Sequence, residues 1–242
     1  MFIIPFKVEN TQKEPNRAAP HLLPPSSQDI QHYFSMLAAK YDMILVITLS
    51  SWLSQFTEFA EKAAATFQNH ASVHIVDSQT TSIGLGVLVE KAAGAISSGA
   101  SPSEVEQIVR MTITRIYMLL FIPELTTLEP VGLLNHSQAV VGEILGILPI
   151  FTMEGGRLTP LEKVHTSRHL FESFQEFLEE FHSPERVALM TGPSQSTLRT
   201  RSMRQYVQDK FRNTLYHEYP FNPHLTALFG MHCAAMAVVG KG

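Results

Sequence analysis

The sequence has little of several features that mark particular classes of protein. A single cysteine, Cys233, excludes a disulfide framework and a cysteine-based zinc site. Lys and Arg number 18 against 22 Asp and Glu, and the formal charge of −4 argues against a general nucleic-acid binder. No apolar run approaches the roughly 18 residues of a membrane helix, and the opening MFIIPFKVENTQ does not resemble a secretory signal. We therefore expect a cytoplasmic protein with no integral membrane segment and no nucleic-acid partner.

Strands and helices alternate in the first half of the chain. Met43–Leu49 is an apolar run typical of a buried parallel strand, and residues 73–76 form a second, β-branched strand. The residues Ser101-Pro102-Ser103-Glu104 form a capping box that begins a helix. We also expect a strand at 2–8, a loop at 9–29, and helices at 30–39, 53–68 and 84–97. This alternation predicts a mostly parallel sheet flanked by helices.

The second half predicts a different type of domain. A Gly155-Gly156 turn between short apolar stretches indicates a hairpin. Strands are expected at 116–122, 149–153, 156–158, 161–165, 186–190 and 225–231, and helices at 137–147, 170–181 and 195–215. The fold class is therefore α/β with two domains: an α/β domain at 1–115 that carries the serine motifs, and an α+β domain with an antiparallel sheet at 116–242.

Polar residues follow both predicted parallel strands, Ser50-Ser51 after the first and Asp77-Ser78 after the second. Ligands of open α/β sheets bind beyond the carboxyl ends of the strands. A helix that begins just after a serine offers free N–H groups and the positive end of its dipole, which suit a carboxylate or a phosphate. The simpler alternative is that Ser50 or Ser51 is an N-cap, and one residue can serve both purposes.

Four segments carry a family resemblance, in order PPSSQ, TLSSWLS, VDSQTTSIGLG and PIFTMEGGRLTPLEKV. In order and spacing they resemble the motifs of the DegV family over nearly the whole chain. The resemblance implies a two-domain protein that encloses a long-chain fatty acid between its domains, with no catalytic residues, cofactor or metal of its own. It also implies a kinase partner, because such proteins resemble the lipid-binding subunit of bacterial fatty acid kinase, which presents the carboxylate to a separate kinase.

The resemblance assigns the fatty-acid carboxylate to five residues: Ser26, Ser50, Ser51, His232 and His165. Ser26 stands where the family has Thr, and His165 where it has Arg. A fixed bidentate arginine is the strongest partner of a carboxylate, so its replacement implies a more neutral head-group site. Burying each methylene contributes roughly 0.8 kcal/mol, so the acyl chain can still dominate the affinity.

Other departures leave alternatives open. The usual first strand of the family is absent, residues 131–134 replace its Gly-Gly-Arg-Ile, and Ala-Ala-Met replaces Gly-Pro-Gly after His232. One alternative is a degenerate member with a structural or regulatory role and no bound lipid. Another is a hydrolase or transferase using Ser50 or Ser78, although no Gly-x-Ser-x-Gly elbow is present. His165 and His169 have metal-ligand spacing but lack a third ligand.

Overall fold

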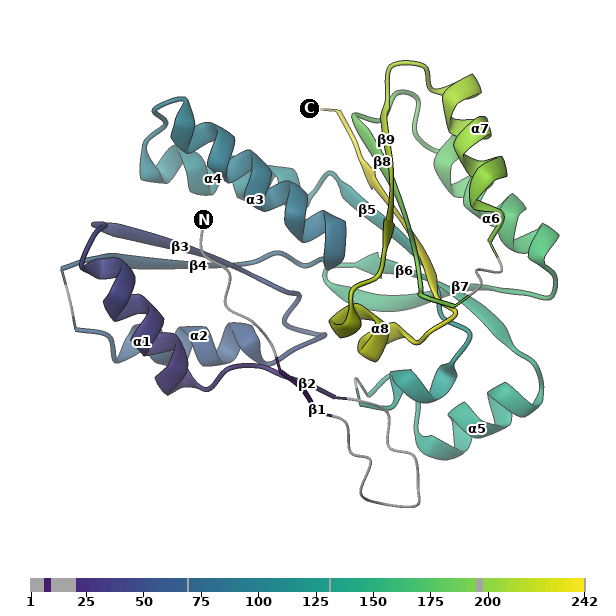
Figure 1. Ribbon diagram of the computed structural model, residues 1–242, viewed down its shortest axis with the longest axis horizontal. Helices are drawn as coiled ribbons and strands as arrows, with labels where there is room; N and C mark the ends of the chain where they lie inside the picture. Colours follow the sequence, from purple (N-terminus) through teal and green to yellow (C-terminus); the bar gives the residue numbers. More distant parts are fainter. Residues whose placement is uncertain (1–6, 10–20, 69, 131, 195–197, 242) are drawn as a thin grey trace. The chain divides into compact units, whose positions relative to one another are not determined.

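The structure is a computed structural model that describes residues 7–9, 21–68, 70–130, 132–194 and 198–241 (Figure 1). The chain forms two compact units. Unit 1 comprises Met1–Lys7, Leu23–Thr114 and Gly155–Arg157, and unit 2 comprises Val8–Leu22, Arg115–Glu154 and Leu158–Gly242. Whether the second domain closes over a lipid site stays a prediction.

Unit 1 contains a parallel pair of strands, β3 (Met43–Thr48) and β4 (Ser72–Asp77), which place Thr48 beside Asp77. Four helices flank the pair: α1 (Ser27–Ala38), α2 (Phe56–Ala65), α3 (Ser82–Ser97) and α4 (Pro102–Ile113). The helices α1 and α2 lie on one side of the strands, and α3, with α4 packed against it, lies on the other (Figure 1). The predicted parallel pairing and the Ser101–Glu104 capping box are both confirmed.

Apolar side chains of α1 and α2 form the core of unit 1. Ile30 and Phe34 on one helix and Phe56 and Ala60 on the other are almost completely buried and belong to one cluster with Ile44 of β3. Ile30 and Phe34 are four residues apart, the spacing that places side chains on one face of a helix. This packing holds β3 against α1 and α2.

The six strands of unit 2 form a mixed sheet in the order β7-β6-β5-β10-β8-β9. Their bounds are β5 Ile116–Phe121, β6 Leu148–Glu154, β7 Arg157–Val164, β8 Arg186–Thr191, β9 Leu215–Pro220 and β10 Ala234–Val239. The pairs β5–β6, β5–β10 and β8–β10 are antiparallel, whereas β8 and β9 run parallel. The prediction of an antiparallel sheet therefore holds for these three pairs but is wrong for the edge strand β9.

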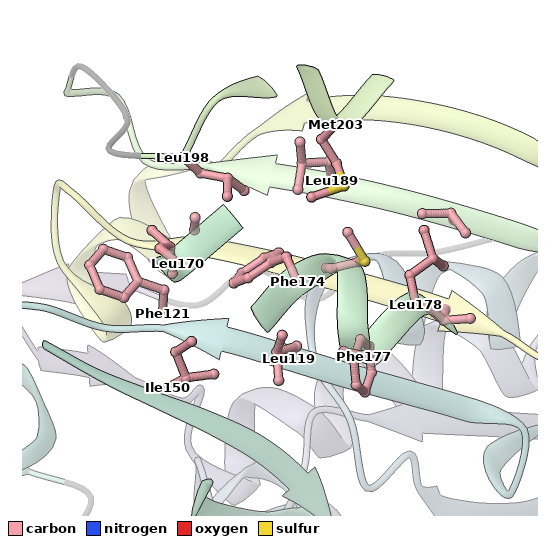
Figure 2. Close-up of a cluster of buried hydrophobic side chains, with 14 of the residues drawn as sticks. Leu119, Phe121, Ile150, Leu170, Phe174, Phe177, Leu178, Leu189, Leu198 and Met203 are labelled. Carbon is pink, nitrogen blue, oxygen red and sulfur yellow. The ribbon is translucent and has the colours of Figure 1, made fainter. Parts of the chain in front are cut away.

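The helices of unit 2 are α5 (His136–Ile144), α6 (Ser167–Glu179), α7 (Thr200–Lys210), α8 (Pro223–Phe229) and a 3-10 turn, η1 (Leu125–Leu128). Of these, α6 and α7 supply side chains to the core cluster of the sheet. Phe174 and Phe177 of α6 pack against strand residues such as Leu119 and Leu189 (Figure 2). The phenylalanines of this helix are therefore core residues of unit 2. None of the helices within the described ranges is both long and apolar enough to cross a bilayer.

Three predictions are wrong in the carboxyl-terminal part of the chain, one in the type of element and two in the bounds. Residues 223–229 form helix α8 in place of the strand expected at 225–231, because Asn222 accepts a hydrogen bond from Leu225 N and Pro223 opens the first turn. The last strand begins only at Ala234. The helix expected at 195–215 spans Thr200–Lys210, and Leu215 starts β9 instead.

At the amino end, two short strands pair with each other, β1 (Lys7–Glu9) and β2 (His21–Leu23). Most of the strand predicted at 2–8 lies outside the described residues. The loop predicted at 9–29 is wrong at its far end, which contains β2 and the first turn of α1.

Candidate functional site

Ser50 is buried at the end of β3, and its hydroxyl is fully engaged by backbone groups. Its Oγ donates to the carbonyl oxygen of Gly156 at 2.6 Å and accepts from Trp52 N at 3.3 Å. Its own N–H donates to Thr80 O at 3.0 Å. A hydroxyl has one proton to donate, so Ser50 offers no further donor while it holds Gly156.

Ser51, the next residue, is exposed and differs from Ser50 in its bonding. Its backbone N–H donates to both carboxylate oxygens of Asp77 at 3.3 Å, while Asp77 Oδ1 also accepts from Gln79 N at 2.9 Å. The expected meeting of the two strand ends is therefore confirmed. Among the described residues no hydrogen bond is made by the Ser51 hydroxyl, which can donate to a ligand.

Neither serine caps the helix that follows. Helix α2 begins at Phe56, and its N-cap is Gln55. The intervening residues form a turn in which Leu53 N and Ser54 N both donate to Ser50 O. The expectation that Ser50 or Ser51 lies at a helix N-terminus is wrong, because this turn separates the strand from the helix.

The loop between β4 and α3 combines unusual backbone conformations with an unpaired polar group. Gln79 and Ser82 have φ angles of 52° and 50°, a region that costs a residue with a side chain of order 1–3 kcal/mol. Thr81 is the N-cap residue of α3, but its hydroxyl makes no capping bond. Of the buried side-chain polar atoms in the described ranges, Thr81 Oγ1 is the one that lacks a partner. This loop is therefore the part of unit 1 with the clearest unused donor.

Gly156, which the sequence marked only as a turn, closes this cluster. It has a φ of 84°, and a Cβ at this position would lie 2.9 Å from Ser50 Oγ and 3.2 Å from Gln79 Cα. Glycine is thus required both by the backbone angle and by the close approach. The Gly-Gly pair was the available signal, but it did not identify Ser50 as the partner.

His232 lies in unit 2, exposed and held by Glu124. Its backbone N–H donates to Glu124 Oε1 at 3.0 Å, and its ring Nδ1 is hydrogen bonded to the same oxygen. Although His232 lies in an apolar run, it is not a core histidine, because its side chain is half exposed. Nothing in the local sequence indicated Glu124, which lies 108 positions away.

Ser26 is the last residue of the loop before α1 and caps that helix. Its Oγ donates to Asp29 Oδ2 at 2.7 Å and accepts from Asp29 N at 3.2 Å, forming a capping box at the start of α1. Its bonds within the described residues are all made with Asp29 or the first turn of this helix.

His165 is exposed between β7 and α6. Its neighbour His169 lies 3.6 Å from Glu162 Oε2. No group of three metal-ligating side chains occurs in the part of the chain that the structure describes. Of the five predicted carboxylate residues, only Ser50 and Ser51 are brought together within one unit by described contacts with the Asp77–Thr80 loop.

Two proteins with DegV in their names are similar to this chain in sequence. A protein from Caldanaerobacter subterraneus that contains a DegV domain is 32% identical over 139 residues, which are 57% of this chain and 49% of that protein. The match thus spans about half of the relative's length. Protein DegV of Bacillus subtilis is 27% identical over 224 residues, or 87% of this chain and 75% of the relative.

Solved structures share the fold at low sequence identity. A DegV family protein from Corynebacterium glutamicum has a TM-score of 0.82 and 20% identity, covering 98% of this chain and 89% of its own. One from Eubacterium eligens, loaded with heptadecanoic acid, has a TM-score of 0.79 and 17% identity, with coverages of 95% and 82%. The Fak B3 protein of the Streptococcus pneumoniae fatty acid kinase, loaded with linoleic acid, has a TM-score of 0.77 and 18% identity. The match covers 92% of this chain and 79% of that protein's chain.

The family comparison agrees with the motifs and with the mixed α/β architecture. The model described as "Uncharacterised protein, DegV family" matches residues 8–241, which include both units almost entirely. This chain therefore belongs to the DegV family.

Proposed function

We propose that this protein binds a long-chain fatty acid and holds its carboxylate with hydroxyl donors at the strand ends of unit 1. The observation that carries the proposal is the polar cluster of Ser50, Ser51 and Thr81, in which two hydroxyls have no protein partner within the described ranges. Related folds were solved with heptadecanoic acid and linoleic acid bound, which supports a fatty acid as the ligand class.

The donors have different roles in this proposal. Ser51 is exposed and donates directly, whereas Ser50 donates to the carboxylate only if its bond to the Gly156 carbonyl is exchanged. Neutral hydroxyl bonds contribute about 0.5–1.5 kcal/mol each. Fourteen buried methylenes would contribute about 11 kcal/mol before the costs of binding. Affinity therefore comes from the chain, and the hydroxyls set the orientation of the head group.

We further propose that the protein presents its fatty acid to a separate kinase and performs no chemistry itself. The likeness to the Fak B3 protein supports this role. The bonding of the two candidate nucleophiles supports it too, because Ser50 and Ser78 donate their hydroxyl protons to the carbonyls of Gly156 and Thr80. A backbone carbonyl is not a general base, so neither serine is activated for attack.

Mass spectrometry of lipids extracted from the purified protein tests the proposal. Stoichiometric C14–C18 acids are the expected result, and a stable protein with no lipid would support the degenerate alternative instead. Ser51→Ala should weaken binding of a fluorescent fatty acid several-fold. Ser97→Ala is the matched control, since its exposed hydroxyl donates only to Ala93 O within α3.

A further inference from the structure

We infer that the edge strand β9 pairs with β9 of a second copy of this chain, so that two sheets of unit 2 join in a symmetric dimer. β9 ends the six-stranded sheet and pairs with β8 along one of its sides. Within the described ranges no strand pairs with its other side. An unpaired strand edge presents N–H and C=O groups that can bind a further strand. The inference concerns unit 2 alone and does not depend on a bound lipid.

The two end strands of this sheet differ in their protection against such pairing. Proline and lysine protect sheet edges, and β7 carries both within the strand, as Pro160 and Lys163. β9 has the sequence LYHEYP, with neither lysine nor arginine, and its proline is the last residue. The carboxylate of Glu218 is neutralised by Arg204, which donates to both of its oxygens at 2.9 and 2.5 Å. The edge at β9 is therefore the less protected of the two.

Alternate residues of β9 direct their backbone groups away from β8. The N–H of Leu215 donates to Glu185 O at 3.1 Å, so the odd-numbered residues of the strand bond to β8. Because backbone groups alternate along a strand, Tyr216 and Glu218 direct their N–H and C=O groups to the open edge. An antiparallel copy centred on His217 pairs Tyr216 of each chain with Glu218 of the other. Both N–H···O bonds are then exchanged in each pair.

The same register makes the side chains of the edge self-complementary. Leu215 and Tyr219 are 53% and 38% exposed. They share one face of β9 with His217, whose ring stacks on that of Tyr219 at a centroid distance of 5.9 Å. Centring the pair on His217 places Leu215 of each copy opposite Tyr219 of the other, and such apolar–aromatic pairs stabilise antiparallel strands. It also avoids a register centred on Glu218, in which two carboxylates would lie opposite each other.

Analytical ultracentrifugation of the full chain at increasing concentration tests the inference. β9 offers six residues to the interface, which implies a weak dimer that dissociates on dilution. Leu215→Lys places a charge at the open edge and should weaken dimerisation about tenfold, since each dimer carries the substitution twice. Leu161→Lys is the matched control, because Leu161 is 56% exposed on the other end strand, β7, and this variant should dimerise as the wild type does. A monomer at every concentration, or a greater loss for Leu161→Lys, overturns the inference.

Further variants test the register. Combining Leu215→Lys with Tyr219→Glu should restore dimerisation, because each new ammonium then lies opposite a new carboxylate of the other copy. His217→Cys should form a disulfide between copies under mild oxidation, since opposed residues of a non-hydrogen-bonded pair have Cα atoms about 4.5 Å apart. Tyr219→Cys should not, because its two copies would lie roughly 13 Å apart along the strands. The native Cys233 is buried and does not interfere. A double variant that stays monomeric, or equal cross-linking of the two cysteine variants, refutes the pairing.

Discussion

Replacing Gly156 with alanine would place a methyl group 2.9 Å from the Ser50 hydroxyl oxygen. Gly155, its neighbour in the same turn, provides a matched control. Both glycines have positive φ angles, 54° for Gly155 and 84° for Gly156, but a Cβ on Gly155 would meet nothing within 4 Å. The two substitutions therefore share the backbone strain, and only Gly156→Ala adds the contacts with Ser50 and Gln79.

The difference can be estimated from these contacts. Left-handed backbone costs an alanine about 1–2 kcal/mol, which both variants lose. The methyl of Gly156→Ala must also displace a buried hydroxyl at 2.9 Å and backbone at 3.2 Å. Overpacking of this kind typically costs about 1–3 kcal/mol. We expect Gly156→Ala to lower the free energy of unfolding by about 2–5 kcal/mol and Gly155→Ala by about 1–2 kcal/mol.

Urea denaturation followed by tryptophan fluorescence is the appropriate assay. Trp52 is the only tryptophan in the sequence, and its backbone N–H donates to Ser50 Oγ, so its fluorescence reports on this turn. Unchanged m-values would assign the shift to stability. Equal losses in the two glycine variants would refute the close approach of Gly156 to Ser50. Combining Ser50→Ala with Gly156→Ala should recover part of the cost, since the hydroxyl is gone.

Further expected outcomes concern single side chains. Thr81→Val should raise the free energy of unfolding of lipid-free protein by about 1–3 kcal/mol in urea titrations, because it removes a buried hydroxyl without a partner; a decrease would reveal a partner. Native Cys233 should resist iodoacetamide at pH 8 and react once unfolded, because burial raises its pKa to about 12; rapid labelling of folded protein would contradict this. The same shift means that stability falls as pH rises above 9, where the unfolded thiol ionises first. Phe174→Ala should cost about 3–5 kcal/mol by thermal or urea unfolding, since the ring is fully buried, and a loss below 1 kcal/mol would refute its place in the core.

Local patterns predicted the features that depend on local physics. The apolar run at Met43–Leu49 indicated a buried parallel strand, and β3 pairs in parallel with β4. The two strand ends meet because parallel strands end at one edge of a sheet, and the Ser51–Asp77 contact follows from that. The ordered motifs identified the family, which the match over residues 8–241 confirms.

Long-range pairing limited what the sequence could predict. Ser50 meets Gly156 across 106 positions, and His232 meets Glu124 across 108. A repeating pattern of apolar residues does not indicate such a distant contact. The hydrogen bond from the Ser50 hydroxyl to Gly156 could therefore not be predicted from the sequence. The central strand β10 is buried along its whole length and lacks the alternation of a half-buried strand, which explains why it was misplaced.

The contribution of Gly155–Arg157 to unit 1 has a consequence for synthesis on the ribosome. A nascent chain that ends at Thr114 contains all of unit 1 except Gly155–Arg157. It therefore lacks the Gly156 carbonyl to which the Ser50 hydroxyl donates. The missing 43 residues, from 115 to 157, take roughly 2–9 s to add at 5–20 residues per second. During that interval the Ser50 hydroxyl lacks its Gly156 acceptor, so the order of translation sets when this hydrogen bond can form.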